Sequence, residues 1–214
     1  MKRHFTATAF VVQQGKTLLH WHRKLQQWMP PGGHLLPDED PVTGVLREVR
    51  EETGIQAELL PLSPTFSFDY PQQLQAPYTI LIEDIAEAGD PHQHIDLIYF
   101  CRPLAGETAG PPSADDTLVW VSQMQLQRNE ALPLASQHRN VPVADDVRTL
   151  ALEALRVERE LAGSLGAHTS TPHRNLRRGR PSGRPGPFET AAYGTGQAPA
   201  CRRAGKGLSL RCFP

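Results

Sequence analysis

Three glutamates stand at helical spacing: Glu48, Glu51 and Glu52 occupy positions i, i+3 and i+4 of one segment. In a helix this spacing places all three carboxylates on one face. Like charges at that separation repel each other, at a cost of about 0.2–0.5 kcal/mol per pair. A divalent cation such as Mg²⁺ or Mn²⁺ would turn the repulsion into binding, because these ions prefer hard oxygen ligands. Taken alone, the pattern still favours an ordinary solvated acidic face.

The helix that would carry these glutamates has signals for both of its ends. Asp40 can cap the N-terminus, Pro41 suits the first helical position, and Gly54 can close the C-terminus. One apolar stripe at helical spacing is expected to pack on a sheet. Its members are Val42, Val45 or Leu46, and Val49. Arg47 lies four residues before Glu51, and we expect it to hold that glutamate by a bidentate contact.

The segment 33–55, GHLLPDEDPVTGVLREVREETGI, fills a longer pattern. The pattern is Gly, five residues, Glu, seven residues, Arg-Glu, an aliphatic residue, any residue, Glu-Glu, any residue, Gly and an aliphatic residue. All nine specified positions are filled, which is far more specific than a short motif. They are Gly33, Glu39, Arg47, Glu48, Val49, Glu51, Glu52, Gly54 and Ile55. On these residues the chain resembles the Nudix hydrolase superfamily.

The resemblance implies a metal-dependent enzyme that hydrolyses a pyrophosphate linkage in a nucleoside diphosphate joined to another moiety, such as a nucleotide or a sugar. It implies that Mg²⁺, or Mn²⁺ in its place, is held by Glu48, Glu51 and Glu52. The backbone carbonyl at or beside Gly33 would complete the metal shell.

The same resemblance implies roles for the remaining signature residues. Glu51 or Glu52 would act as the general base, and Arg47 would orient a glutamate rather than contact substrate. Glu39 and Gly54 would support the loop and the helix. Two alternatives stay open: a Nudix-fold regulator that binds a nucleotide without cleaving it, and a pyrophosphohydrolase that acts on RNA 5′ ends.

Further polar residues lie outside the signature. Strand alternation predicts His94 and Asp96 on one face, where both could contact substrate. Metal ligation by these two together with His92 is the weaker alternative, because the glutamates already supply a site. In the family an additional loop carboxylate often binds metal or activates water. The candidates here are Glu107, Asp115 and Asp116, of which Asp116 is preferred and is also a candidate for substrate binding.

The elements that must position these residues alternate between strands and helices. Two β-rich runs, 5–12 and 16–22, flank a turn at Gln13-Gln14-Gly15 and predict a hairpin. Further strands are expected at 55–60, 78–85, 94–102 and 117–122, and helices at 123–128 and 143–161. The loops 61–77 and 106–116 are expected to carry specificity. The result is an α/β protein with a mixed sheet between helices, the α/β/α sandwich that the resemblance also implies.

Composition changes sharply near the C-terminus. Before Leu165 there are 13 basic and 22 acidic residues, and from Leu165 onward nine basic and one acidic residue. We predict a Nudix domain over 1–161 and a disordered Arg/Gly/Pro-rich tail over 162–214. The basic tail could bind nucleic acid, although a solvated tail is the stronger expectation.

The cysteines indicate a reducing environment. Cys101, Cys201 and Cys212 form no C-x-x-C motif, which argues against a disulfide framework and against a zinc site. No segment approaches the roughly 18 apolar residues that cross a bilayer, so no membrane association is expected. We therefore predict a cytoplasmic protein, and the resemblance implies a nucleotide-type small molecule as its partner. The resemblance also allows a homodimer.

Overall fold

The structure, a computed structural model, describes residues 1–67, 69–86, 88–107 and 117–167. It begins with the predicted hairpin, formed by β1 (Lys2–Gln13) and β2 (Lys16–His22). Gln14 and Gly15 both have positive φ, 52° and 72°. This is the backbone twist that two-residue hairpin turns require. Asp115 and Asp116 lie outside the described residues, as does the stretch 168–214 of the predicted tail.

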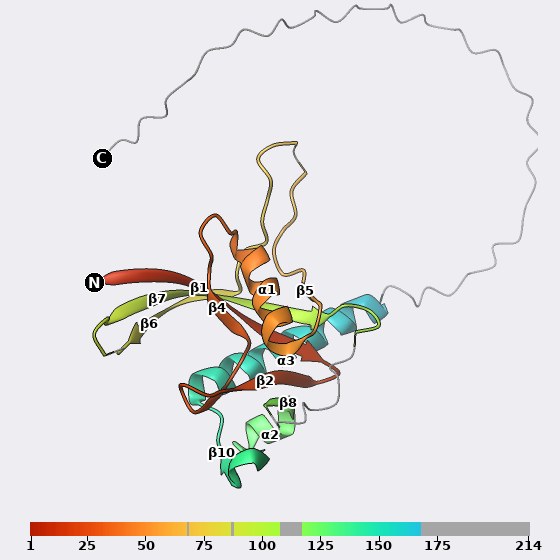
Figure 1. Cartoon of the computed structure of the whole chain (residues 1–214). Helices are drawn as coiled ribbons and strands as arrows, with labels where there is room; N and C mark the ends of the chain where they lie inside the picture. Colours follow the sequence, from red (N-terminus) through yellow and green to blue (C-terminus); the bar gives the residue numbers. More distant parts are fainter. Residues whose placement is uncertain (68, 87, 108–116, 168–214) are drawn as a thin grey trace, which may run out of the picture. The chain divides into compact units, whose positions relative to one another are not determined.

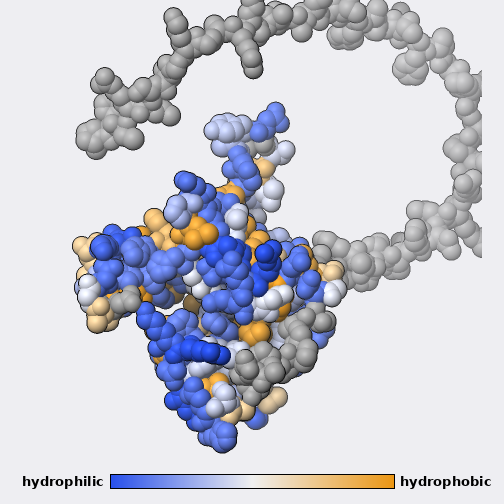
Figure 2. Space-filling view, in the orientation of Figure 1, coloured by the Kyte–Doolittle hydropathy of each residue, from blue (hydrophilic) through white to orange (hydrophobic). Residues whose placement is uncertain are grey.

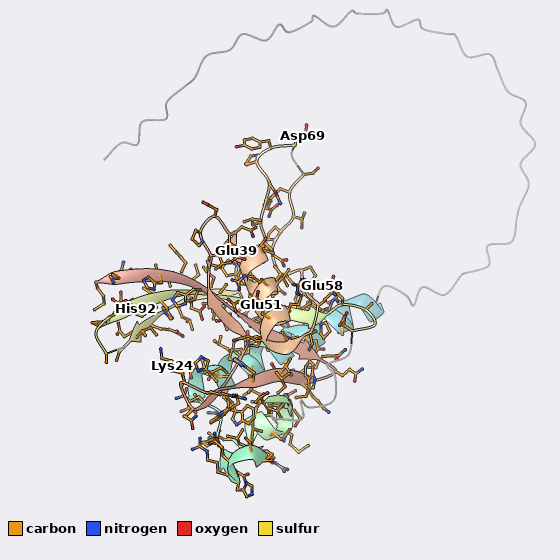
Figure 3. The ribbon with its side chains drawn as sticks, in the orientation of Figure 1. Lys24, Glu39, Glu51, Glu58, Asp69 and His92 are labelled. Carbon is orange, nitrogen blue, oxygen red and sulfur yellow. The ribbon has the colours of Figure 1, made fainter. Side chains whose placement is uncertain are left out.

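Among the described residues, eight strands form one mixed sheet (Figure 1), and two short strands near residues 132–141 pair separately as a hairpin. β7 (His92–Pro103) runs parallel to β1 and antiparallel to β6 (Thr79–Ile85) and β5 (Ala57–Leu59). β4 (Gly32–His34) pairs with β1, while β3 (Gln27–Met29) and β8 (Leu118–Ser122) pair with β2. The connection between β5 and β6 projects from the sheet, with Asp69 at its tip (Figure 3).

Helices cover both faces of the sheet. α1 (Pro41–Thr53) packs on one face and α3 (Asp145–Ala167) on the other (Figure 1). The smaller elements are α2 (Gln123–Gln127), β9 (Leu132–Leu134), the 3-10 turn η1 (Ala135–Gln137) and β10 (Arg139–Val141). This confirms the predicted α/β/α arrangement. α3 continues to Ala167, so residues 162–167 are helical and not part of a disordered tail as predicted.

Strand alternation sorts the side chains of β1 between the two faces. Ala7 and Ala9 belong to the core that contains Val45 of α1. Phe10 belongs to the opposite core, which contains Leu155 of α3. His4 and Thr6 stand at even-numbered positions like Phe10. They therefore point to the face of the sheet that α3 covers farther along.

The Gly32-Gly33 segment belongs to the strand β4. A Cβ atom on Gly32 would lie 2.6 Å from Thr8 Oγ1 and 2.8 Å from the carbonyl oxygen of Ala7. Only glycine therefore lets the backbone approach β1 this closely. No strand was predicted here, because a short strand that begins with two glycines has no alternating side chains.

Among the described residues, the structure contains no helix that is both long enough and apolar enough to cross a bilayer. Figure 2 shows a largely hydrophilic surface on the side that carries α1, broken by small hydrophobic patches.

Candidate active site

The helix α1 begins and ends where its caps predict. The Asp40 side chain accepts hydrogen bonds from the backbone N–H groups of Val42 (2.9 Å) and Thr43 (3.0 Å). Gly54 takes a left-handed conformation at φ 72°, and its N–H donates to the carbonyl of Arg50. Val45 and Val49 are fully buried. These contacts fix the rotation of the helix, and with it the direction of its three glutamates.

Arg47 makes its bidentate contact with Glu39, so the predicted bidentate contact with Glu51 is wrong. Nε and Nη2 of Arg47 donate to the two oxygens of Glu39 at 2.9 and 3.0 Å. This pairing holds the pKa of Glu39 below its usual value. Glu51 accepts one bond, 3.0 Å from Nη1, and more than half of its side chain is exposed. Glu39 is preferred over the i,i+4 neighbour Glu51 because its carboxylate lies in line with the Nε–Nη2 edge of the guanidinium and can accept two parallel hydrogen bonds.

Glu48 lies against Gly33. A Cβ atom at Gly33 would come within 2.6 Å of Glu48 Oε1, so the glycine leaves the space that the carboxylate occupies. The same oxygen accepts a hydrogen bond from Arg47 Nη1 at 2.8 Å. At the contact between α1 and β4, the helix therefore contributes the Glu48 carboxylate and the strand contributes the backbone of Gly33, which has no side chain.

Glu52 reaches the neighbouring glycine. Its Oε2 accepts a hydrogen bond from the backbone N–H of Gly32 at 3.0 Å and lies 3.5 Å from Nε2 of His20. Burial, followed by repulsion from Glu48 and Glu51, raises the pKa of Glu52 to about 7. Burial, followed by the charge of His22, lowers the pKa of His20 to about 4. His20 is therefore neutral at pH 7 and does not balance the charge of the carboxylate.

His20 was missed by sequence reasoning. It lies on β2, in the segment 16–22, which was predicted to be a strand without any functional residue. It shares strand parity with Leu18, which packs in the core that contains α1. That parity was the available indication that its side chain faces the signature helix.

The donor set fits a hard divalent cation. Glu48, Glu51 and Glu52 supply carboxylate oxygens beside the bare backbone of Gly32 and Gly33, and oxygen is the donor that Mg²⁺ and Mn²⁺ prefer. One cationic side chain, Arg47, donates hydrogen bonds to these glutamates. It contacts Glu48 and Glu51, whereas Glu52 carries a raised pKa that a bound cation would relieve.

Asp96 and His94 lie on the face of the sheet opposite to α1. Asp96 is buried and accepts hydrogen bonds from the hydroxyls of Thr6 (2.9 Å) and Thr8 (3.1 Å). Burial raises the pKa of Asp96 and lowers that of His94 to about 4, the latter with help from His34, His92 and His4. The structure therefore groups His94 with other histidines rather than with the glutamates. A substrate contact of His94, Asp96 or Asp116 stays a prediction.

Of the loop acids, only Glu107 is described. Its backbone N–H donates to the carbonyl of Leu104, in the turn that follows β7. This turn lies at the opposite end of β7 from His92 and His94.

Comparison with known proteins adds a family to this geometry. The sequence pattern of the family described as "NUDIX domain" matches residues 2–142. A crystal structure of a NUDIX-family hydrolase from Clostridium perfringens is 26% identical, covers 74% of this chain and 99% of its own, and superimposes with a TM-score of 0.54.

Two curated relatives match over short segments. The m7GpppN-mRNA hydrolase NUDT17 of Bos taurus is 59% identical over 29 residues, which are 14% of this chain and 10% of that protein. The asymmetrical bis(5'-nucleosyl)-tetraphosphatase of Mus musculus is 45% identical over 42 residues, 20% of this chain and 29% of that protein. The matched stretches thus span less than a third of either relative.

Proposed function

The chain belongs to the NUDIX domain family, and we propose that it is a pyrophosphohydrolase that cleaves a phosphoanhydride bond in a nucleoside diphosphate joined to another moiety. The observation that supports this proposal most directly is the contact between the glutamates of α1 and the glycines of β4. There Glu48 faces Gly33 and Glu52 accepts from the Gly32 amide. A nucleotide-binding regulator would not need this full set of carboxylates, so the enzyme is the better conclusion.

Hydrolysis of a phosphoanhydride bond needs positive charge beside the negatively charged phosphates of the substrate. Mg²⁺ or Mn²⁺, when bound, would supply it by stabilising the charge that develops on the phosphate oxygens and by acidifying water. Glu48 and Glu52 are the ligands we favour, with Glu51 and the backbone at Gly33 as further donors. Their place on one rigid helix fixes the distance between donors before substrate arrives.

Glu52 is the better of the two candidates for the general base. It is less exposed than Glu51, with 27% against 54% of the side chain accessible. One of its oxygens is held by the Gly32 amide, which orients the carboxylate to accept a proton. Glu51 shares the Nη1 group of Arg47 with Glu48, which suits a role in holding the site together.

Arg47 acts as a positioning residue. It contacts Glu39, Glu48 and Glu51 and donates to the carbonyl of His34 at 3.2 Å. Its pKa is raised by these carboxylates, first by Glu39, so the guanidinium stays charged. These bonds tie the loop before α1, the strand β4 and two carboxylates of the helix into one unit.

The names of the two curated relatives point to substrates in which a polyphosphate joins two nucleosides. We propose a substrate of this general kind. The full-length chain should be assayed on dinucleoside polyphosphates, nucleoside diphosphate sugars and capped RNA, with Mg²⁺ and with Mn²⁺, and the released nucleotides identified.

The deciding variant is Glu52→Gln, which keeps the size of the side chain and removes its charge. We expect turnover to fall by about 10²–10⁴-fold while the thermal unfolding temperature changes little. Glu58→Gln is the matched control, because Glu58 forms an exposed ion pair with Arg102 on β7. Near-normal activity of Glu52→Gln with Mg²⁺, or an equal loss in the control, would overturn the assignment.

A further inference from the structure

Four histidines from three strands converge away from the glutamates of α1. His4 lies on β1, His34 at the end of β4, and His92 and His94 at the start of β7. Each offers one ring nitrogen, and these four atoms all lie within 4.8 Å of one another. Figure 3 shows His92 at the end of β7 that is remote from Glu51. We call these four residues the histidine cluster.

Strand pairing explains why the four side chains meet. His4 is the direct partner of His94 across the parallel pair β1–β7, and His34 is the partner of Thr6, two residues along β1. His92 precedes His94 by two residues, so both project from the same face. The register of three hydrogen-bonded strands therefore holds the cluster.

The separations of the nitrogens suit a small tetrahedral ion. A zinc ion with Zn–N bonds of about 2.0–2.1 Å places its ligand nitrogens about 3.3–3.4 Å apart. His4 Nδ1 lies 3.3 Å from His34 Nε2, and His92 Nε2 lies 3.1 Å from His94 Nε2. Two pairs thus already stand near the required spacing, and small side-chain rotations would bring the pairs together around an ion.

One histidine is oriented by a backbone carbonyl. Nδ1 of His92 lies 2.7 Å from the carbonyl oxygen of Asp90, which can only accept, so Nδ1 carries the proton. This leaves Nε2 with its lone pair directed at the other rings. A second nitrogen that donates to a carbonyl is the usual support of a metal-binding histidine.

We propose that the histidine cluster binds Zn²⁺ or a similar first-row divalent ion, at a site separate from the carboxylates of α1. Imidazole nitrogen is a donor that suits zinc, copper and nickel, whereas Mg²⁺ prefers oxygen. Four protein ligands fill a tetrahedral shell and leave no position for a reacting water, so the site is structural. The exposed side chain of His34 gives the ion access from solvent.

The surroundings favour a cation. Glu83 on β6 is the direct partner of His94, and the buried Asp96 follows two residues later on the same face. Two carboxylates beside the imidazoles lower the cost of placing a divalent charge there.

The bound ion would cross-link β1, β4 and β7. The backbone carbonyl of His34 accepts from Arg47 at 3.2 Å, and Gly33 immediately before it faces Glu48. An ion that holds the His34 side chain would therefore steady the strand that forms one wall of the candidate active site.

The test is a titration of the full chain with Zn²⁺ in the presence of excess Mg²⁺, which occupies hard oxygen sites. Cys201 and Cys212 are replaced by serine so that no tail thiol competes. We expect one equivalent to bind, the unfolding temperature to rise, and Co²⁺ in place of Zn²⁺ to give the strong visible absorption of a tetrahedral nitrogen site.

Two variants of the cluster, His4→Ala and His34→Ala, which we call the rim variants because these two side chains are more exposed than that of His92, should each weaken Zn²⁺ binding at least tenfold. Each should also abolish the cobalt spectrum of the parent protein. His138→Asn is the matched control, because His138 is an exposed histidine in a left-handed conformation that asparagine tolerates. Glu52→Gln should bind Zn²⁺ like the parent protein, which separates this site from the catalytic proposal.

Binding that survives both rim variants would overturn the proposal, as would an octahedral cobalt spectrum in the parent protein. Failure of a rim variant to fold does not decide the matter alone, so the parent protein is also measured: absence of any Zn²⁺-dependent rise in its unfolding temperature would equally refute the site.

Discussion

The guanidinium of Arg47 makes two parallel hydrogen bonds to the carboxylate of Glu39, eight residues earlier in the chain. Glu39 also accepts from the backbone N–H of Leu36 at 3.0 Å. The loop before α1 is therefore attached to the helix by a planar, charged contact. The remaining nitrogen, Nη1, is left to hold Glu48 and Glu51.

Replacing Glu39 by Gln should release this arrangement without removing a metal ligand. Glutamine has one acceptor oxygen where glutamate has two, so Arg47 would lose one of its two hydrogen bonds to residue 39. We therefore expect the Mg²⁺ concentration for half-maximal activity to rise about 10–100-fold. A Mg²⁺ titration of hydrolysis checks this. Arg47→Lys should act in the same direction, since a lysine cannot form the bidentate contact. An unchanged Mg²⁺ requirement in both variants would contradict the positioning role.

The adjacent glycines of β4 should respond differently to alanine. At Gly32 the added Cβ meets the backbone of β1 at 2.8 Å, so Gly32→Ala should lower the free energy of unfolding strongly. At Gly33 the three atoms nearest to an added Cβ all belong to the Glu48 carboxylate, which can rotate away. Gly33→Ala should therefore fold but lose activity. Urea denaturation and turnover, measured on both variants, separate the two effects, and a fully active Gly33→Ala would contradict the assigned contact.

The N-cap at Asp40 should contribute measurably to the free energy of unfolding. Asp40→Ala removes the oxygen Oδ1, which accepts two backbone hydrogen bonds at the first turn of α1, and should cost about 1 kcal/mol in the free energy of unfolding. Asp40→Asn keeps an acceptor oxygen and should cost much less. Urea denaturation of the pair gives the difference. Equal destabilisation by Ala and Asn would show that charge rather than capping is lost.

A carboxylate on α3 should make stability depend on acid pH. Hydrogen bonds from Arg156, then from the hydroxyl of Tyr78, lower the pKa of Glu153 to about 2 from 4.5. Because the folded pKa lies below the unfolded one, this contribution is present above about pH 4.5 and is lost as the pH falls toward 2.

Glu153→Gln should therefore reduce the drop in urea midpoint between pH 5 and the acid limit, whereas Glu130→Gln, in an exposed pair with Arg128, should not. Since part of the Glu153 side chain is also exposed, the change will be small. An identical acid profile for the parent protein and Glu153→Gln would refute the contribution.

Local patterns allowed the sequence to predict the signature helix closely. The cap at Asp40, the left-handed Gly54 and the buried Val45 and Val49 all follow from contacts within four residues. The main strands were also recoverable, because each is long enough to show a β-rich run. β3, β4, β9 and β10 were missed, since a strand of three residues shows little side-chain alternation. β5 is equally short, and it was predicted only as part of the longer run 55–60.

That three glutamates share one helix face follows from their spacing alone, because the helix repeat brings together residues three and four positions apart. Other contacts are set by the folded chain: Arg47 pairs with Glu39, and His20 lies beside Glu52. His4 likewise meets His34 and His94 only in the folded protein. These pairs lie 8 to 90 residues apart, and no spacing rule links them. Their meeting depends on strand register and on how α1 packs, which the whole chain sets together.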